Sequence, residues 1–178
     1  MGDKALKKRS SHFAVLRPKG EASMSVEARL KEMGIILPQA AAPVANYVPA
    51  VRTGSLLIIS GQLCFGPDGK LAPEHKGKVG GEVTPEDATQ AARLCAINLL
   101  AQAKAALGSL ENIRRCVRLG GFFNCVPHFA ALPGLMNGAS DLMVDALGDA
   151  GRHARTTIGV AELPMDAVAE VEAMFEVG

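Results

Sequence analysis

The chain has 178 residues, of which 48% are apolar and 21% are charged, and its formal net charge is +1. This length and balance fit one globular domain with a single core. No apolar run approaches the ~18–20 residues that a membrane helix needs, and no apolar stretch follows the basic residues at the start, which argues against a secretory signal. We therefore expect a cytoplasmic protein with no membrane partner.

The charge is unevenly distributed along the chain. Residues 1–23 hold six basic and two acidic residues, whereas the remaining 155 hold 13 basic and 16 acidic ones. A basic tail can mark nucleic-acid binding, but we interpret 1–23 as a disordered basic extension and 24–178 as one domain. RNA binding draws on basic surface and stacking aromatics. The domain is acidic and has one Tyr and no Trp, so we expect no nucleic-acid partner.

The first part of the domain predicts a helix, a loop and a strand. Residues 24–33 read as a short helix that Ser25 caps and Gly34 ends. Residues 37–49 are rich in proline and alanine and predict an extended loop. Residues 50–60 predict a turn and a strand, whose central run is apolar on both sides.

A long helix is the clearest element of the chain. Thr84 can cap it, Pro85 suits its first position, and Gly108 follows its last residue, Leu107. Its small residues favour close packing on a sheet. Residues 113–123 then predict a strand with a basic edge.

The last third predicts a second helix and two strands. The helix covers residues 133–147, and the strands cover 155–162 and 168–177 with a short turn between them. The order is typical of an α+β fold, a sheet with two helices packed on one face. Because the strands look apolar on both sides and two helices cover only one, partner chains are expected to bury the other.

Standard catalytic and metal-binding signatures are absent from the sequence. There is no glycine-rich phosphate loop, and the four histidines have no metal-ligand spacing. We therefore predict no cofactor and no metal. We interpret His153 as a surface histidine at the start of a strand.

Arg155 is the first candidate for a binding residue. Small residues follow on its face of the strand, which leaves space for a ligand beside a guanidinium that can hold a carboxylate by two hydrogen bonds. The alternative is a structural salt bridge across a hairpin to Glu170 or Glu172. These two acids alternate with apolar residues on the last strand. They are either acid–base groups or a solvated strand face.

Two polar segments complete the set of candidates. Ser60, Gly61 and Gln62 end a buried strand and can contact a ligand or simply leave the sheet. Asn137 and Gly138 are poor residues for the middle of a helix. Either the helix starts near them, or another chain approaches closely there.

These segments together resemble the RidA/YjgF family over about residues 43–177. The matching pieces are Tyr47, Ser60-Gly61-Gln62 and Asn137-Gly138, followed by a closing stretch. That stretch runs from Ala154-Arg155 through Leu163-Pro164 to Glu170-Val171-Glu172, and its order is the most specific part of the match.

The resemblance implies a chorismate mutase-like fold, a homotrimer and clefts between subunits. The best understood members of the family hydrolyse reactive enamines and imines such as 2-aminoacrylate, giving a 2-keto acid and ammonia. By position, Arg155 would hold the substrate carboxylate and Glu170 would help place the attacking water. Tyr47, Ser60, Gly61 and Asn137 would line the cleft.

The chain also departs from the family pattern. Thr157 stands where deaminases commonly have Cys, Cys64 stands where Pro is usual, and the region between 123 and 155 is extended. These departures fit a longer YjgF-like branch. Three functions are open: an imine or enamine deaminase, a non-catalytic protein that binds small 2-imino or 2-keto acids, and, least favoured, an endoribonuclease or translation inhibitor.

Overall fold

A five-stranded mixed sheet with helices on one face forms the molecule. The computed structural model describes residues 24–41 and 46–178, so the predicted extension 1–23 lies outside the described residues. The strand order is β1-β2-β5-β3-β4, in which β3 and β4 are parallel and the other neighbours antiparallel. The elements are α1 (Val26–Glu32), β1 (Ala50–Thr53), β2 (Leu56–Leu63), α2 (Pro85–Leu107), β3 (Ile113–Asn124), α3 (Leu132–Leu135), α4 (Asn137–Leu147), β4 (Ala154–Val160) and β5 (Ala169–Val177).

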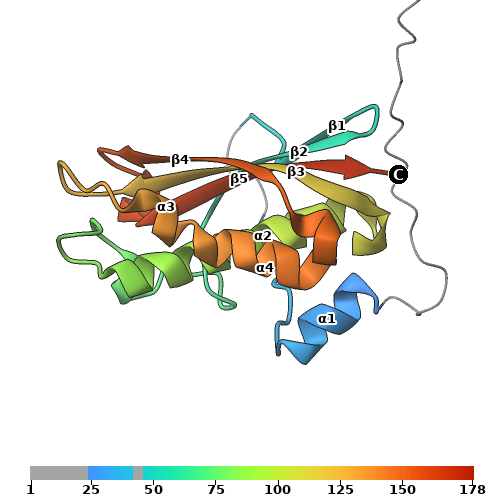
Figure 1. Ribbon diagram of the computed structural model, residues 1–178, viewed down its shortest axis with the longest axis horizontal. Coiled ribbons are helices and arrows are strands. Elements are labelled where there is room, and N and C mark those ends of the chain that lie inside the picture. The colour runs from blue at the N-terminus through green and yellow to red at the C-terminus, as the bar shows by residue number, and fades with distance from the viewer. Residues whose placement is uncertain (1–23, 42–45) are drawn as a thin grey trace, which may run out of the picture.

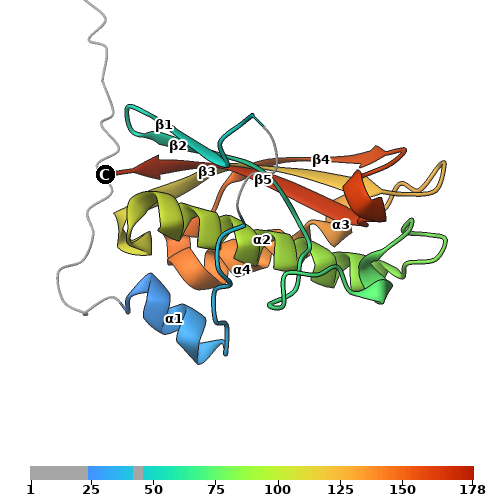
Figure 2. The ribbon, with the colours of Figure 1, turned by 180° about the vertical axis from the view of Figure 1, so that it is seen from behind.

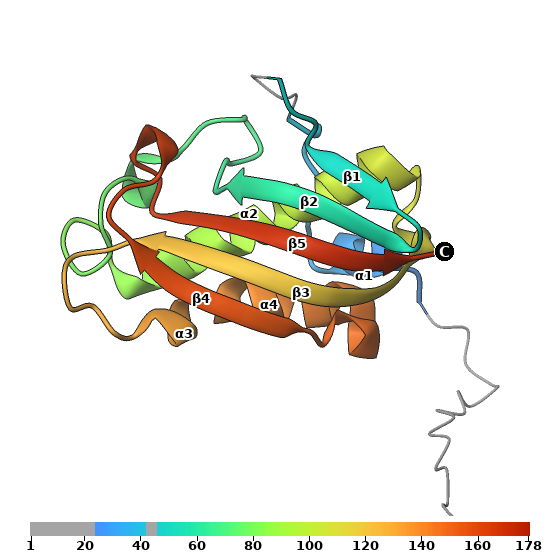
Figure 3. The same ribbon diagram turned by 90° about the horizontal axis from the view of Figure 1, so that it is seen from above.

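The core lies between the sheet and the helices α2 and α4, which run along the same face (Figures 1 and 2). Strand β5 is central, and its alternate residues are buried on the helix side, as a period of two requires. Glu170 and Glu172 lie on the other side. Figure 3 looks onto this side of the sheet, which we call the open face. The predicted α+β class is thus confirmed, with the short helix α1 added beside α4.

Local signals predicted α2 accurately. Thr84 Oγ1 accepts a hydrogen bond from the backbone N–H of Asp87 at 3.1 Å, and Pro85 is the first helical residue. Gly108 ends the helix with a φ of +76°, a conformation that suits glycine. The small side chains of α2 are buried against β2 and β5, as expected.

The odd position of Gly138 has a structural cause. Helix α4 begins at Asn137, directly after the one-turn helix α3, so the predicted helix over 133–147 is real but broken at Met136. A Cβ atom at position 138 would collide with the backbone carbonyl oxygen of Thr89 on α2. The close approach is therefore between two helices of the same chain.

The predicted hairpin of the last two strands is wrong. β3 lies between β4 and β5, pairing in parallel with the first and antiparallel with the second. The turn at Pro164–Asp166 therefore carries the chain across a strand rather than back along its neighbour. The turn motif specified the change of direction, but it did not specify the pairing partner.

The open face of the sheet carries apolar side chains. In β2, Leu57 and Ile59 are buried under the helices, whereas Leu56 and Ile58 each remain 37% exposed on the open face. Ile158 of β4 is 44% exposed. Across the described ranges, no helix combines the length and the apolar character needed to span a membrane.

Candidate functional site

The guanidinium of Arg155 lies on the helix side of β4, at the edge of the sheet. Its Nη1 donates to Asn137 Oδ1 at 2.9 Å and to Ser140 Oγ at 3.0 Å, and its Nη2 donates to the carbonyl oxygen of Pro133 at 3.0 Å. All three acceptors belong to α3 and α4 or their junction. The start of α4 thus holds Arg155 in place.

All the protein partners of this guanidinium are neutral. A guanidinium has five N–H donors, and three are occupied by the bonds above. Nε–H and the second Nη2 hydrogen have no partner among the described residues. Glu172 instead pairs with Arg118 at 3.0 Å, so the alternative of a structural salt bridge from Arg155 to Glu170 or Glu172 is wrong. Arg155 keeps its charge and two donors for a ligand.

His153 supports this arrangement through Ser140. Its Nε2 lies 3.1 Å from Ser140 Oγ, and its Nδ1 lies 2.6 Å from the carbonyl oxygen of Gly151. The side chain is half-buried with both ring nitrogens partnered. His153 does stand at the start of β4, as predicted, but it is half-buried and hydrogen-bonded rather than a free surface side chain.

Glu170 belongs to a second group of residues on the opposite side of the sheet. It lines a cavity of about 380 Å³ together with Tyr47 and Gly61. Gly61 is needed for close contact, because a Cβ atom at this position would collide with Oε1 of Glu170. Gln62 and Met165 also line this cavity. Three of the predicted site residues thus lie together.

The environment of Glu170 favours its protonated form. Partial burial in the sheet raises the pKa of its carboxyl, because desolvation disfavours the charged form. The negative charge of Glu172, on the same face of β5, raises this pKa further. A carboxyl with a raised pKa exchanges protons closer to neutral pH, as an acid–base group requires.

The remaining predicted residues fall beside these two groups. Ser60 is half-buried next to Gly61, and its Oγ accepts a hydrogen bond from Gln62 Nε2 at 3.5 Å. Thr157 is half-buried on β4. It lies two residues after Arg155 and therefore on the same face of the strand. The structure thus forms two half-sites, which we name the Arg155 half-site (Asn137, Ser140, His153, Arg155 and Thr157) and the Glu170 half-site (Tyr47, Ser60, Gly61, Gln62 and Glu170).

Sequence reasoning missed the roles of Ser140 and His153. The signal was present, since Ser140 is three residues after Asn137 and shares its helix face. His153 lies just before β4 and two residues before Arg155, a spacing that puts two side chains on the same side of an extended segment. Within the described ranges, no cluster of three or more His, Cys, Asp or Glu side chains is arranged to hold a metal ion.

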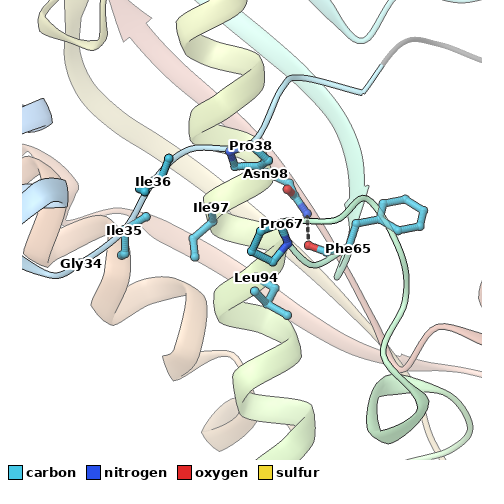
Figure 4. A pocket seen from close by; sticks show the side chains of 9 residues that line it. All are labelled: Gly34, Ile35, Ile36, Pro38, Phe65, Pro67, Leu94, Ile97 and Asn98. Carbon is cyan, nitrogen blue, oxygen red and sulfur yellow. Dashed lines mark hydrogen bonds between the residues drawn. The ribbon is translucent and has the colours of Figure 1, made fainter.

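A smaller apolar pocket lies apart from both half-sites. It has a volume of about 150 Å³ and is formed where the segment after α1 crosses α2 (Figure 4). Its polar side chain, Asn98, donates to the carbonyl oxygens of Phe65 at 3.0 Å and Leu63 at 2.9 Å. Both amide hydrogens are thus used within the protein, and the pocket contains none of the predicted site residues.

Comparisons with known proteins place the chain in a family. The family described as "YjgF/chorismate mutase-like, putative endoribonuclease" matches residues 27–177. Protein TCP17 of Trypanosoma cruzi is 43% identical over 156 residues, which cover 87% of this chain and 96% of that protein. Among solved structures, the protein Atu1372 of Agrobacterium tumefaciens, of unknown function, is 47% identical with a TM-score of 0.79, covering 86% of this chain and 92% of its own.

A more distant structure carries a ligand. E. coli TdcF with bound serine is 25% identical with a TM-score of 0.55, and the match covers 79% of this chain and 94% of TdcF. The family match over residues 27–177 spans all five strands and all the described site residues. The chain therefore belongs to the YjgF/RidA family, with its chorismate mutase-like α+β fold.

Proposed function

We propose that the protein binds small 2-imino and 2-keto acids through Arg155 and hydrolyses reactive enamines and imines such as 2-aminoacrylate. The observation that carries this proposal is the state of Arg155, a guanidinium held by three neutral acceptors with two N–H groups left over. A carboxylate fits those two donors with both oxygens. A hydrogen bond to a charged group contributes about 1.5–3 kcal/mol.

The two half-sites come together only between two copies of the chain. Arg155 lies on the helix side of β4, whereas Glu170 lies on the open face of β5, with β3 between their strands. One chain therefore cannot present both groups to one small molecule. A second copy packed against the open face would bring its own Arg155 half-site, at the edge strand β4, to the Glu170 half-site of the first copy. The exposed apolar side chains Leu56, Ile58 and Ile158 support burial of this face, and we propose a homotrimer.

Each half-site supplies a different part of the reaction. Arg155, with Asn137 and Thr157 beside it, binds and orients the carboxylate. Glu170, with its raised pKa, accepts a proton from water as the water adds to C2 of the imine. The imine reacts in its N-protonated form, which an enamine reaches by taking up a proton at C3, so the addition gives a neutral carbinolamine. Glu170 then returns its proton to the amine nitrogen, the C–N bond breaks to release ammonia, and the hydroxyl proton passes to Glu170 as the carbonyl of the 2-keto acid forms.

The walls of the Glu170 half-site limit the size of the substrate. Tyr47 and Gly61 border the cavity of about 380 Å³ that Glu170 faces, and Ser60 lies beside Gly61. A backbone without a Cβ at Gly61 lets a small ligand approach the carboxyl closely. TdcF, a relative with bound serine, supports an amino-acid-sized ligand for this chain too.

An assay with a freshly generated substrate tests the proposal. A dehydratase acting on serine releases 2-aminoacrylate, and its decay is followed with and without this protein. Faster formation of pyruvate and ammonia is the expected result, and Arg155→Ala should remove the acceleration. If pyruvate binds in calorimetry but the decay is not accelerated, the protein is a non-catalytic ligand-binding protein. If neither occurs, the substrate class is wrong.

A further inference from the structure

The hydrogen positions at His153 follow from its two partners. A carbonyl oxygen can only accept, so the short contact of 2.6 Å to Gly151 places the hydrogen on Nδ1 of His153. In the neutral ring Nε2 then has no hydrogen and is an acceptor. With the ring neutral, Ser140 Oγ, 3.1 Å away, donates its hydrogen to Nε2.

This direction fixes what Ser140 offers to Arg155. A hydroxyl has one hydrogen and two lone pairs. With its hydrogen turned toward His153, Ser140 presents lone pairs to Arg155 Nη1, which donates to it at 3.0 Å. The hydrogen bonds thus run in one direction, from Arg155 through Ser140 and His153 to the carbonyl of Gly151.

The three acceptors around Arg155 together decide which edge of the guanidinium is free. Asn137 takes the other Nη1 hydrogen, and the Pro133 carbonyl takes one from Nη2. Nε–H and the second Nη2–H remain, and these two donors can form a fork along one side of the guanidinium. A planar carboxylate matches this fork, provided that the guanidinium does not rotate.

We infer that Ser140 and His153 are positioning residues that lock the guanidinium of Arg155 so that its Nε–Nη2 edge faces the ligand. The inference depends on the proposed carboxylate site only in the part of its test that measures ligand binding. His153 acts through Ser140, because its contacts join Ser140 to the backbone of Gly151 rather than to Arg155. Arg155 is exposed, so without these bonds its long side chain would sample other rotamers and would have to be ordered again on binding.

A double-mutant cycle tests the order of action. Ser140→Ala and His153→Phe should each weaken pyruvate binding about threefold to tenfold, the cost of ordering one side chain. In the double variant, His153→Phe should have no further effect, since Ser140 is the group through which it acts. His153→Gln, whose side-chain oxygen can accept from Ser140, should restore part of the affinity. His128→Asn changes an exposed histidine outside the Arg155 half-site, and asparagine tolerates the φ of +67° at this position, so this control should leave affinity unchanged.

A measurement without ligand separates this inference from the proposed function. Nitrogen-15 NMR of labelled arginine should resolve separate Nη1 and Nη2 signals for Arg155 in the wild type, assigned by their loss in Arg155→Lys. The two signals should merge in Ser140→Ala and in His153→Phe, because the lost or weakened Nη1 contact to Ser140 speeds rotation of the guanidinium, although Asn137 and Pro133 still accept from it.

Either of two results would overturn the inference: merged Arg155 signals in the wild type, or losses of affinity that add in the double variant. Separate signals that merge in the variants, with no binding of pyruvate to the wild type, would leave the inference standing. That outcome would count against the proposed function alone.

Discussion

Arg155 and Glu170 lie on opposite faces of one sheet, on strands that β3 separates. Arg155 is held on the helix side by α3 and α4, and Glu170 lies with Gly61 on the open face. Because a carboxylate ligand and its attacking water must lie within a few ångströms of each other, these two groups can act on one molecule only across a subunit boundary.

Subunit complementation is the first prediction. Arg155→Ala and Glu170→Gln should each abolish hydrolysis of 2-aminoacrylate. Unfolded together in equal amounts and refolded, they should recover about one quarter of wild-type activity, because random assembly into closed oligomers pairs an intact Arg155 with an intact Glu170 at that frequency. The two variants refolded separately and then mixed are the control. No recovery after joint refolding would place both groups in the same subunit's site.

The pH dependence of stability should reflect the raised pKa of Glu170. A carboxyl with a higher pKa in the folded state stabilises the protein fully below its ordinary value of 4.5, and this stabilisation is lost as pH rises through the folded pKa. Glu170→Gln, which cannot ionise, should therefore melt higher than wild type at pH 7 and equally at about pH 4. Each kcal/mol in the free energy of unfolding corresponds to about 2–4 °C in the thermal midpoint at this chain length. A lower midpoint for Glu170→Gln at pH 7 would contradict the direction of the shift.

Glu172, the second cause of the raised pKa of Glu170, can be removed separately. Glu172→Gln deletes the neighbouring negative charge and frees Arg118 from its ion pair, and both changes favour ionised Glu170. The pKa of Glu170, measured by carbon-13 NMR of its carboxyl, should fall toward its ordinary value. Desolvation remains, so the fall should be partial.

Gly61→Ala should displace the Glu170 carboxyl. The new methyl group would occupy the position of Oε1, and the flexible side chain can move away at modest cost. We expect a large loss of hydrolytic activity with a thermal midpoint within a few degrees of wild type. Gly134→Ala, where a Cβ meets no atom within 4 Å, is the matched control. Normal activity in Gly61→Ala would show that Glu170 does not need its present position.

Gly138→Ala should instead destabilise the fold. Its Cβ would collide with the backbone of Thr89, which cannot move without separating α2 from α4. Overpacking of this kind typically costs about 1–3 kcal/mol. Chemical denaturation should show this loss, and because α4 carries Asn137 and Ser140, pyruvate binding should weaken in the same variant. An unchanged denaturation midpoint would mean that the helices separate easily.

The sequence correctly predicted the elements that local signals define. It failed for strand pairing, which depends on segments far apart in the chain. The boundaries of α2 follow from Thr84, Pro85 and Gly108, which act within a few residues. The pairing of β5 with β2 and β3 joins segments about 50 to 120 residues apart, and no turn motif encodes it. The hairpin expected for the last two strands was therefore wrong.

The candidate site divides in the same way into residues that the sequence indicates and residues that only the fold brings together. Glycine at 61 and an arginine at the start of a strand were visible as candidates, and the family resemblance added Tyr47 and Asn137. Ser140 and His153 were missed, because their hydrogen bonds join a helix to a strand only after the chain has folded. The placement of α4 beside β4 in the folded protein creates this contact.

The most direct test measures ligand affinity and stability on the same variant of Arg155. Arg155→Ala should lose affinity for pyruvate, measured by calorimetry. Its thermal midpoint should stay close to wild type, because Arg155 is exposed at the edge of the sheet and all its partners are neutral groups of α3 and α4. Arg155→Lys keeps the charge without the fork and should still bind weakly. An unchanged affinity with a lowered midpoint would contradict the account, since Arg155 would then be a structural residue.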